Sequence, residues 1–399
     1  MNEQTKNNIW TKSFVIIFLS NFFLFLVFYA LLTTLPIYVL DELNGSETQA
    51  GLVATIFLLS AIIVRPFSGK LLEDFGKKKM LMISMLLFMA SSFLYLIVDH
   101  LYLLLALRFF HGIWFSIATT ATGAIAADLV PDSRRGEGLG YFAMSMNIAV
   151  VVGPFIGLTL LQVTTFNNLF WVLSVLMVGA IVFTALVHDP IVEKSAKRKL
   201  SLNDLFERKA LPVAAVASLI AFGYAAVLSF ISIYAKSLGL MEAASYFYAI
   251  FAAAMLISRP FVGRLFDKVG PNIVIYPAIG LFAAGLFVLS ITNSSMLLFL
   301  SALLIGLGYG TLVPCLQTLA IQSAGRGRSA HATATFFTLF DIGVATGSYL
   351  LGLIATNFGY QQLYITTGII VIAVLFVYRL MMKKRREAEE KNYKAVKIG

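Results

Sequence analysis

The sequence predicts an all-α membrane protein in which twelve transmembrane helices form two pseudo-symmetric six-helix bundles. Composition, the spacing of apolar runs and an internal repeat lead to this prediction. Of the 399 residues, 59% are hydrophobic and 13% are charged, whereas a soluble domain has roughly 45–50% apolar and about 25% charged residues. A soluble fold of this composition would expose too much apolar surface to water. The single cysteine, Cys315, excludes a disulfide within the chain.

Long apolar runs alternate with short polar segments from one end of the chain to the other. Each run is close to the ~20 residues that a helix needs to cross ~30 Å of hydrocarbon. The expected spans are 14–40, 48–69, 80–98, 101–127, 138–162, 169–187, 211–235, 243–263, 273–292, 296–322, 330–356 and 361–381.

The distribution of lysine and arginine orients these spans. With the N-terminus in the cytoplasm, 26 of the 30 basic residues fall in segments on the cytosolic side, and the outer loops hold only Lys236. The other three, Arg65, Arg108 and Arg259, fall within expected helices. Cytosolic loops of membrane proteins carry such an excess of basic residues. We therefore expect a multi-pass protein of the cell (plasma) membrane with both termini in the cytoplasm, and not a nucleic-acid-binding protein, despite the net charge of +10.

An internal repeat divides the chain. The segment 65–76, RPFSGKLLEDFG, recurs as 259–270, RPFVGRLFDKVG, at an offset of 194 residues. Both copies fall at the same end of the second helix of a six-helix half. The predicted organisation is an N-terminal bundle over 1–187, a cytosolic linker over 188–209, a C-terminal bundle over 210–382 and a basic tail over 383–399.

The segment 69–78, GKLLEDFGKK, resembles the signature between helices 2 and 3 of the major facilitator superfamily. Glu73 stands where that family usually has Asp, and Asp74 stands where Arg is common. The resemblance covers the whole chain. It implies the major facilitator fold, a secondary active transporter, and a substrate site at the interface between the two halves.

The resemblance also implies a cytosolic gate. The glycines would let helices approach closely, and Glu73 and Asp267 would pair with Arg134, Arg135 or their counterparts in the second half when the cytosolic side is shut. The alternative is that these charges only set topology. The candidate gate residues are Gly69, Glu73, Asp74, Gly76, Lys77, Lys78, Asp128, Arg134, Arg135, Gly263, Asp267, Gly270, Arg326 and Arg328.

The fifth expected helix contains Gly153, Pro154 and Gly157, which resemble the helix-5 signature of the drug/proton antiporter branch. That signature is associated with export. Glycine and proline there would permit close helix contact and a bend. The copy is partial, and the alternative is generic kinking, since both residues are frequent in membrane helices.

Asp341 and Arg108 are the charges expected inside the bilayer. Asp341 lies about 12 residues into its helix, about 18 Å at 1.5 Å per residue, where a carboxylate costs several kcal/mol unless it is paired, hydrated or protonated. We interpret it as a proton-coupling site; the alternative is an acid hydrogen-bonded to hydroxyls such as Thr338. Arg108 resembles a helix-4 motif linked to proton coupling, or it snorkels outward. His111 could titrate near neutral pH, or it is simply packed.

In the family, helices 1, 4, 7 and 10 face the cavity and helices 2, 5, 8 and 11 form its walls. The expected lining is aromatic, which suits amphipathic or cationic molecules through area burial and cation–π contact; the alternative is that these rings pack or face lipid. The candidates are Asn21, Phe25, Tyr29, Tyr38, Trp114, Asn147, Tyr224, Phe230, Tyr234, Tyr309, Gln317, Phe337 and Phe340.

The most consistent function is a secondary active transporter that exports amphipathic or cationic small molecules in exchange for protons, by alternating access. One alternative is an exporter of one endogenous solute, such as a sugar, an amino-acid derivative or a metallophore. A remote alternative is a non-transporting receptor or enzyme. The sequence has no nucleotide-binding loop motif, so we expect the proton gradient as energy source, no cofactor, no metal and no catalytic site. The expected partners are a small-molecule substrate, protons and the lipid bilayer, with the chain as a monomer.

Overall fold

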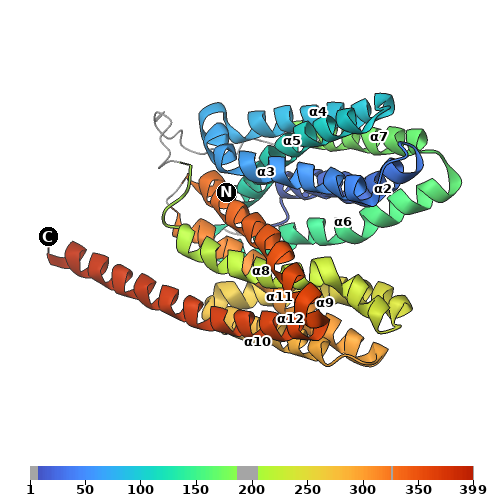
Figure 1. Ribbon diagram of the computed structural model, residues 1–399. Coiled ribbons are helices and arrows are strands. Elements are labelled where there is room, and N and C mark those ends of the chain that lie inside the picture. Colours follow the sequence, from blue (N-terminus) through green and yellow to red (C-terminus); the bar gives the residue numbers. More distant parts are fainter. Residues whose placement is uncertain (1–7, 187–204, 325–326, 399) are drawn as a thin grey trace. The chain divides into compact units, whose positions relative to one another are not determined.

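The computed structural model describes residues 8–186, 205–324 and 327–398. All regular secondary structure in these residues is helical (Figure 1), and eleven of the described helices are long and apolar enough to cross a membrane. Most of the expected linker, residues 188–204, and the gate candidate Arg326 lie outside the described residues. The helices are α2 (Lys12–Asp41), α3 (Glu47–Phe75), α4 (Lys77–Leu94), η1 (Tyr95–Ile97), α5 (Leu101–Leu129), η2 (Asp132–Arg134), α6 (Arg135–Val163), α7 (Phe166–Ala185), α8 (Leu211–Ser237), α9 (Met241–Val269), α10 (Asn272–Ser290), α11 (Ser295–Ser323) and α12 (Ser329–Ile398).

The last helix, α12, is interrupted at Gly359. This glycine has φ +84°, a left-handed conformation that lacks a steric cost only for glycine. The expected spans 330–356 and 361–381 lie on either side of it. The helix then continues to Ile398, through the region expected as a tail.

Matching glycines end α3 and α9. Gly76 has φ +90° and Gly270 has φ +106°, and their N–H groups donate to the carbonyls of Leu72 (3.1 Å) and Phe266 (3.0 Å). The signature expected between helices 2 and 3 is therefore mostly helical, because no residue before Gly76 leaves the helical conformation. The expected end of this span at residue 69 is wrong, and each copy of the repeat forms about the last three turns of a helix.

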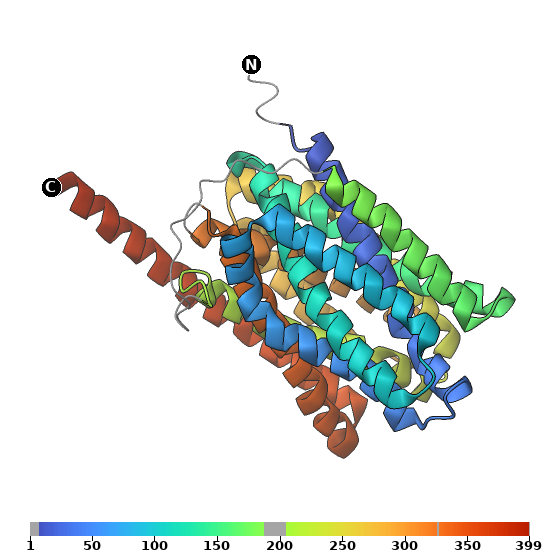
Figure 2. The same cartoon turned by 90° about the horizontal axis from the view of Figure 1, so that it is seen from above.

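The chain divides into two compact units. Unit 1 comprises residues 1–207 and 324–338, and unit 2 comprises 208–323 and 339–399. In unit 1, α3 packs on α5 and α2 packs on α6. In unit 2, α9 packs on α11, which also packs on α10. Figure 2 shows the helices from a second direction.

The 194-residue repeat extends to the packing of these helices. Gly112 of α5 lies against the carbonyl of Phe57 in α3, and Gly306 of α11 lies against the carbonyl of Phe251 in α9. Both glycines and both phenylalanines are related by the offset of 194. The α3–α5 and α9–α11 contacts therefore have the same register, each set by a glycine that leaves no room for a Cβ atom.

The helix-5 glycines lie at a similar close contact. A Cβ on Gly153 of α6 would lie 2.7 Å from the carbonyl oxygen of Leu26 in α2, and one on Gly157 would lie 2.9 Å from Thr34. In unit 2, Gly347 meets the carbonyl of Phe222 in α8 at 2.6 Å. Gly153 and Gly347 are again 194 residues apart, so close helix approach is a property of both halves. Pro154 lies inside α6.

Candidate functional site

Arg108 lies buried between α5 and α3, with 1% of its surface exposed. Its Nε donates to the carbonyl of Val53 (3.2 Å), one Nη donates to the Tyr95 hydroxyl (3.4 Å), and its guanidinium carbon lies 4.1 Å from the centre of the Phe57 ring. No carboxylate of the described residues pairs with it. An arginine stays charged even when buried, so a carbonyl, a hydroxyl and an aromatic face are what stabilise this cation. They hold it inside the unit, which favours a buried role over outward snorkelling.

The Tyr95 hydroxyl links Arg108 to His111. Its oxygen lies 2.9 Å from Nδ1 of His111, whose ring is fully buried against Phe88. A guanidinium can only donate hydrogen bonds, so the hydroxyl accepts from Arg108 and keeps its own proton available for Nδ1 of His111. Nε2 of His111 has no partner among the described residues. This geometry favours a packed, hydrogen-bonded His111 over one that carries a proton.

Asn21 connects three helices of unit 1. Its Nδ2 donates to the Ser145 hydroxyl in α6 (2.8 Å), and its Oδ1 accepts from the Thr122 hydroxyl in α5 (2.8 Å). Asn21 is 2% exposed. The side chain expected in the cavity therefore has both polar atoms engaged in joining α2, α5 and α6.

The other expected lining residues of unit 1 differ in whether their polar atoms form hydrogen bonds. Tyr38 donates to the carbonyl of Val98 (2.8 Å). Phe25 and Tyr29 are half-buried and stack with ring centres 6.1 Å apart. Nε1 of Trp114 and Nδ2 of the buried Asn147 have no hydrogen-bond partner in the described structure. These last two are the expected lining residues of unit 1 that retain a buried free donor.

In unit 2, expected lining residues form an aromatic stack. The rings of Tyr224 in α8 and Tyr309 in α11 lie 3.8 Å apart at 9°, and Phe251 of α9 stacks on both at 6.1 and 6.3 Å. Gln317 is buried in the same α11, and its Nε2 has no partner in the described structure. By contrast, the Tyr234 hydroxyl is used, because it donates to the carbonyl of Leu289 (3.0 Å).

Asp341 lies in α12, half-buried, 12 residues after the helix begins at Ser329 and 18 before the break at Gly359. Asp341 and the neighbouring Phe340 both interact with other residues of the protein. Phe337, one turn earlier, belongs to unit 1, where its ring centre lies 5.3 Å from the guanidinium carbon of Arg65.

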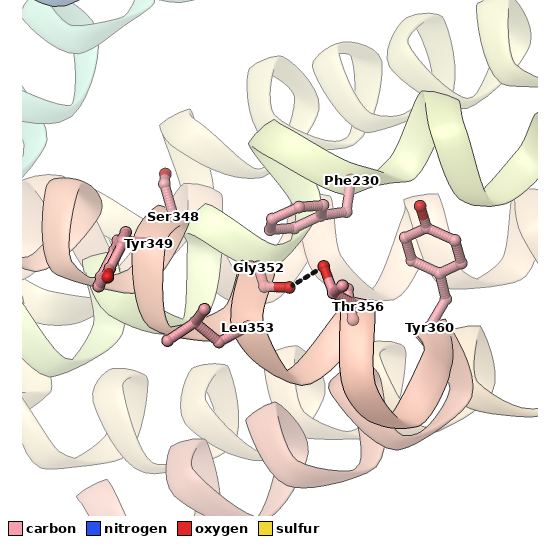
Figure 3. A pocket seen from close by; sticks show the side chains of 8 residues that line it. Phe230, Ser348, Tyr349, Gly352, Leu353, Thr356 and Tyr360 are labelled. Carbon is pink, nitrogen blue, oxygen red and sulfur yellow. Dashed lines mark hydrogen bonds between the residues drawn. The ribbon is translucent and has the colours of Figure 1, made fainter.

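A shallow cavity of about 390 Å³ opens in unit 2 beside the break in α12 (Figure 3). The expected lining residue Phe230 of α8 borders it together with Tyr349 and Tyr360 of α12. The Thr356 hydroxyl on its wall donates to the carbonyl of Gly352 (3.0 Å). Ser348, also on the wall, has its hydroxyl 3.0 Å from that of Ser229 in α8. The cavity is thus walled by three aromatic rings, by small and aliphatic residues, and by hydroxyls of which two already have partners.

A charged group gathers in unit 1, where α3, α4 and α5 meet the start of α12; we call it the Lys77 cluster. Nζ of Lys77 pairs with Asp128 and donates to the Ser329 hydroxyl (2.7 Å). A Cβ on Gly69 would lie 2.9 Å from the Cα atom of His331, so α3 and α12 touch at this glycine. The cluster comprises Lys70, Glu73, Asp74, Lys77, Asp128, Ser329 and His331.

Glu73 does not pair with Arg134 or Arg135 in this structure. Its carboxylate lies 3.7 Å from Nζ of Lys70 and 3.4 Å from Nε2 of His331. Arg134 bonds Glu137 (2.7 Å) and Arg135 pairs with Asp132, each three residues away on the adjoining helical turns. Both acids lie three residues from their arginine, so these pairs link η2 to the first turn of α6.

The remaining gate candidates have other partners or positions. Arg328 pairs with Glu207, whose N–H donates to the Thr335 hydroxyl (2.8 Å). Lys78 is half-buried at the start of α4. Gly263 and Asp267 lie in the last turns of α9, in unit 2.

Sequence reasoning missed Tyr95, Lys70, Glu207 and His331. Lys70 stands inside the repeat, three residues before Glu73 and four before Asp74, so an (i, i+3) and (i, i+4) reading would have found it. Tyr95, Glu207 and His331 carry no signal in the sequence, because each meets its partner only through the packing of distant segments.

The comparisons with known proteins agree with this architecture. The family model "Major Facilitator Superfamily" matches residues 17–348. The chain is 25% identical over 387 residues to "Multidrug resistance protein MdtG" of Proteus mirabilis, covering 93% of this chain and 96% of that one. It is 24% identical to "Multi-drug resistance efflux pump PmrA" of Streptococcus pneumoniae, over 84% of this chain and 88% of the relative.

Solved structures share the fold at lower identity. The human organic anion transporter MFSD10 (TETRAN) has a TM-score of 0.82 at 16% identity, covering 94% of this chain and 100% of that one. The Escherichia coli fucose:proton symporter FucP has a TM-score of 0.73 at 15% identity, covering 92% and 99%. The expected family resemblance and the expectation of an all-helical, multi-pass membrane protein that is not an enzyme are confirmed. This chain belongs to the Major Facilitator Superfamily of transporters.

Proposed function

We propose that this transporter exports amphipathic or cationic small molecules in exchange for protons. The observation that carries the proposal is Asp341, an acid in the middle of an apolar helical segment. Similarity over most of the chain to two proteins named for multidrug resistance or efflux supports the direction of transport. The aromatic rings of Phe25, Tyr29, Tyr224 and Tyr309 would supply apolar area and cation–π contact to such substrates.

Asp341 stands apart from the other described acids of the membrane helices. Asp128 lies next to the end of α5, and Glu137 lies at the start of α6. The charged form of an acid far from both ends of its helix is costly unless the carboxylate is paired or hydrated, and protonation is a further way to relieve that cost. Protonation from the outside would release the substrate, and deprotonation toward the cytoplasm would reset the site. Each proton would bring about 2.3 kcal/mol per 100 mV of membrane potential.

Within this proposal, the N-terminal and C-terminal halves of the chain each form a six-helix bundle, with twelve spans in total. The eleven apolar helices and the break at Gly359 support this count. The basic loops support cytoplasmic termini. The chain would act as a monomer, with no cofactor and with the proton gradient as its energy source.

We place the cytosolic gate at the Lys77 cluster. When Lys77 bonds both Asp128 and Ser329, it ties α4 and α5 to the start of α12. Its Nζ and the Asp128 carboxylate are mostly buried, with 11% and 14% of the side chains exposed, so water and salt screen this pair less than a surface pair. Breaking these contacts would free the start of α12 to move during alternating access.

An exporter of one polar endogenous solute is the second candidate. It is favoured by the buried amide nitrogens of Asn147 and Gln317, which have no partner in the described structure and would suit a hydrogen-bonding solute. A resistance profile separates the candidates. Protection of cells from several unrelated cationic dyes supports multidrug export, whereas protection from one metabolite alone supports the second.

The central test is proton-driven efflux in membrane vesicles with Asp341→Asn. We expect the variant to bind a dye such as ethidium but to lose transport that responds to an imposed pH gradient, because its amide cannot release a proton. Glu387→Gln, the same acid-to-amide change on an exposed side chain of α12, is the matched control and should transport normally. Gradient-driven efflux that persists unchanged in Asp341→Asn would remove Asp341 from the coupling mechanism.

A further inference from the structure

Arg259 of α9 is a buried cation with two donor atoms that have no partner in the described structure. Its side chain is 3% exposed, and neither Nε nor one of its Nη atoms has a hydrogen-bond partner in the described structure. It lies close enough to Tyr309 and Cys315 of α11 to interact with both electrostatically, and neither neighbour is a carboxylate. Burying polar groups and charges without partners is costly, so this arrangement calls for an acceptor.

The copy of this residue in the other half has such an acceptor. Arg65 is the equivalent of Arg259 at the offset of 194, and its Nη1 donates to the Thr119 hydroxyl (3.2 Å). Position 119 corresponds to Val313, which offers no hydroxyl. Because Gly112 and Gly306 set the same register in the two halves, Val313 occupies the place opposite Arg259 that Thr119 occupies opposite Arg65.

A second unused donor lies on the same helix. Gln317 follows Val313 by one helical turn, so the two share a face of α11, and Nε2 of Gln317 is buried without a partner. Arginine offers donors only. The complement of this donor set is an acceptor with negative charge, which a guanidinium binds through charge-assisted hydrogen bonds. The stacked rings of Tyr224 and Tyr309 lie on the helices beside it and offer an apolar surface.

We propose that Arg259 and Gln317 bind the acid group of an amphipathic organic anion, a carboxylate in the simplest case, whose apolar part packs on the Tyr224–Tyr309 stack. This site extends the range of transported molecules to amphipathic acids. It rests on the proposed function as regards transport, but binding to it does not depend on a proton gradient.

The test is equilibrium binding to the full-length protein in lipid nanodiscs, without any gradient. The probes are 2-naphthoate and its neutral isostere 2-naphthamide, titrated by calorimetry. We expect the wild type to bind the carboxylate about tenfold to a hundredfold more tightly than the amide, the range for charge-assisted hydrogen bonds to a buried cation. Arg259→Gln should abolish that preference.

Two further variants test whether the preference depends on the unpartnered donors of Arg259. Val313→Thr restores the hydroxyl that Arg65 has, so it should satisfy Arg259 internally and reduce the preference while keeping the charge. Arg65→Gln makes the same change as Arg259→Gln at the other copy of the repeat and should leave the preference intact. Without ligand, Arg259→Gln should unfold at a temperature no lower than the wild type, because it removes an uncompensated buried charge.

Equal binding of the two probes to the wild type, including no measurable binding of either, overturns the proposal. A preference that survives in Arg259→Gln overturns it as well. These outcomes are separable from failure of the proposed function. If the carboxylate preference depends on Arg259 but proton-driven efflux is absent, the binding site is supported and the antiport mechanism is contradicted. If proton-driven efflux is present but the carboxylate preference is not, the antiport mechanism is supported and the binding site is contradicted.

Discussion

At the scale of single residues, the sequence predicts which polar groups are buried, and the structure shows which partners they have. The position of Arg108 inside an apolar run could be predicted from the sequence, because a lone charge there is conspicuous. Its partners could not, since the carbonyl of Val53 and the hydroxyl of Tyr95 come from other segments. The same holds for Asn21, whose bonds to Thr122 and Ser145 span more than 100 residues.

Replacing Tyr95 with phenylalanine should destabilise the protein by about 1–3 kcal/mol. The change keeps the ring but leaves an N–H of Arg108 and Nδ1 of His111 buried without their shared hydroxyl, and that is the range for an unsatisfied buried group. The measurement is the apparent unfolding temperature in detergent micelles. Tyr102→Phe, at an 81% exposed position, is the control and should unfold like the wild type. Equal stability of the two variants would show that the Tyr95 hydroxyl does not stabilise the cluster.

At the scale of helices, glycine decides where segments begin, end and touch. Gly76 and Gly270 end α3 and α9 through a positive φ, so the family signature forms the ends of helices. The spans were predictable from the length of the apolar runs, because the thickness of the bilayer sets the length of helix that is needed to cross it. The ends and the crossings were not, because they depend on local backbone conformation and on which carbonyl faces each glycine.

Gly306→Ala should destabilise unit 2 by about 1–3 kcal/mol, the usual cost of overpacking. The new Cβ would lie 2.7 Å from the carbonyl oxygen of Phe251 and 2.8 Å from Cβ of Ala254, and a helical carbonyl cannot move aside cheaply. Gly280→Ala in α10 meets nothing within 4 Å and should be neutral or stabilising by up to about 1 kcal/mol, from helix propensity. Thermal unfolding of the two variants checks this, and a reversed order of stability would contradict the packing described for α9 and α11.

At the scale of the whole molecule, the repeat explains both the similarity and the differences between the halves. Pairs 194 residues apart, such as Gly112 and Gly306, hold equivalent helix contacts. Other equivalent positions have diverged in chemistry: Thr119 has become Val313, and Asn147 corresponds to Asp341. Functional specialisation of each half thus lies in polar side chains on a shared packing scheme.

The orientation in the membrane can be tested with the native cysteine left in place, because Cys315 is buried. A cysteine at Asn293, exposed between α10 and α11, should react with a membrane-impermeant maleimide on intact cells. A cysteine at Lys79, exposed in the first turn of α4, should react only after permeabilisation. These expectations follow from the excess of basic residues on the cytosolic side. Labelling of Lys79→Cys on intact cells would show that the chain has the opposite orientation in the membrane.

The sequence by itself determined the class of protein, the approximate helices, the repeat and the residues of unusual polarity within apolar runs. These follow from composition and periodicity, which the bilayer imposes on every span independently. Only the tertiary structure decided which polar groups are satisfied and which are not. It joined Arg108 to His111 through Tyr95, brought His331 to Glu73, and left two donors of Arg259 without an acceptor in the described structure. A hydrogen bond requires two groups within about 3 Å, and chain folding alone sets such distances between segments far apart in sequence.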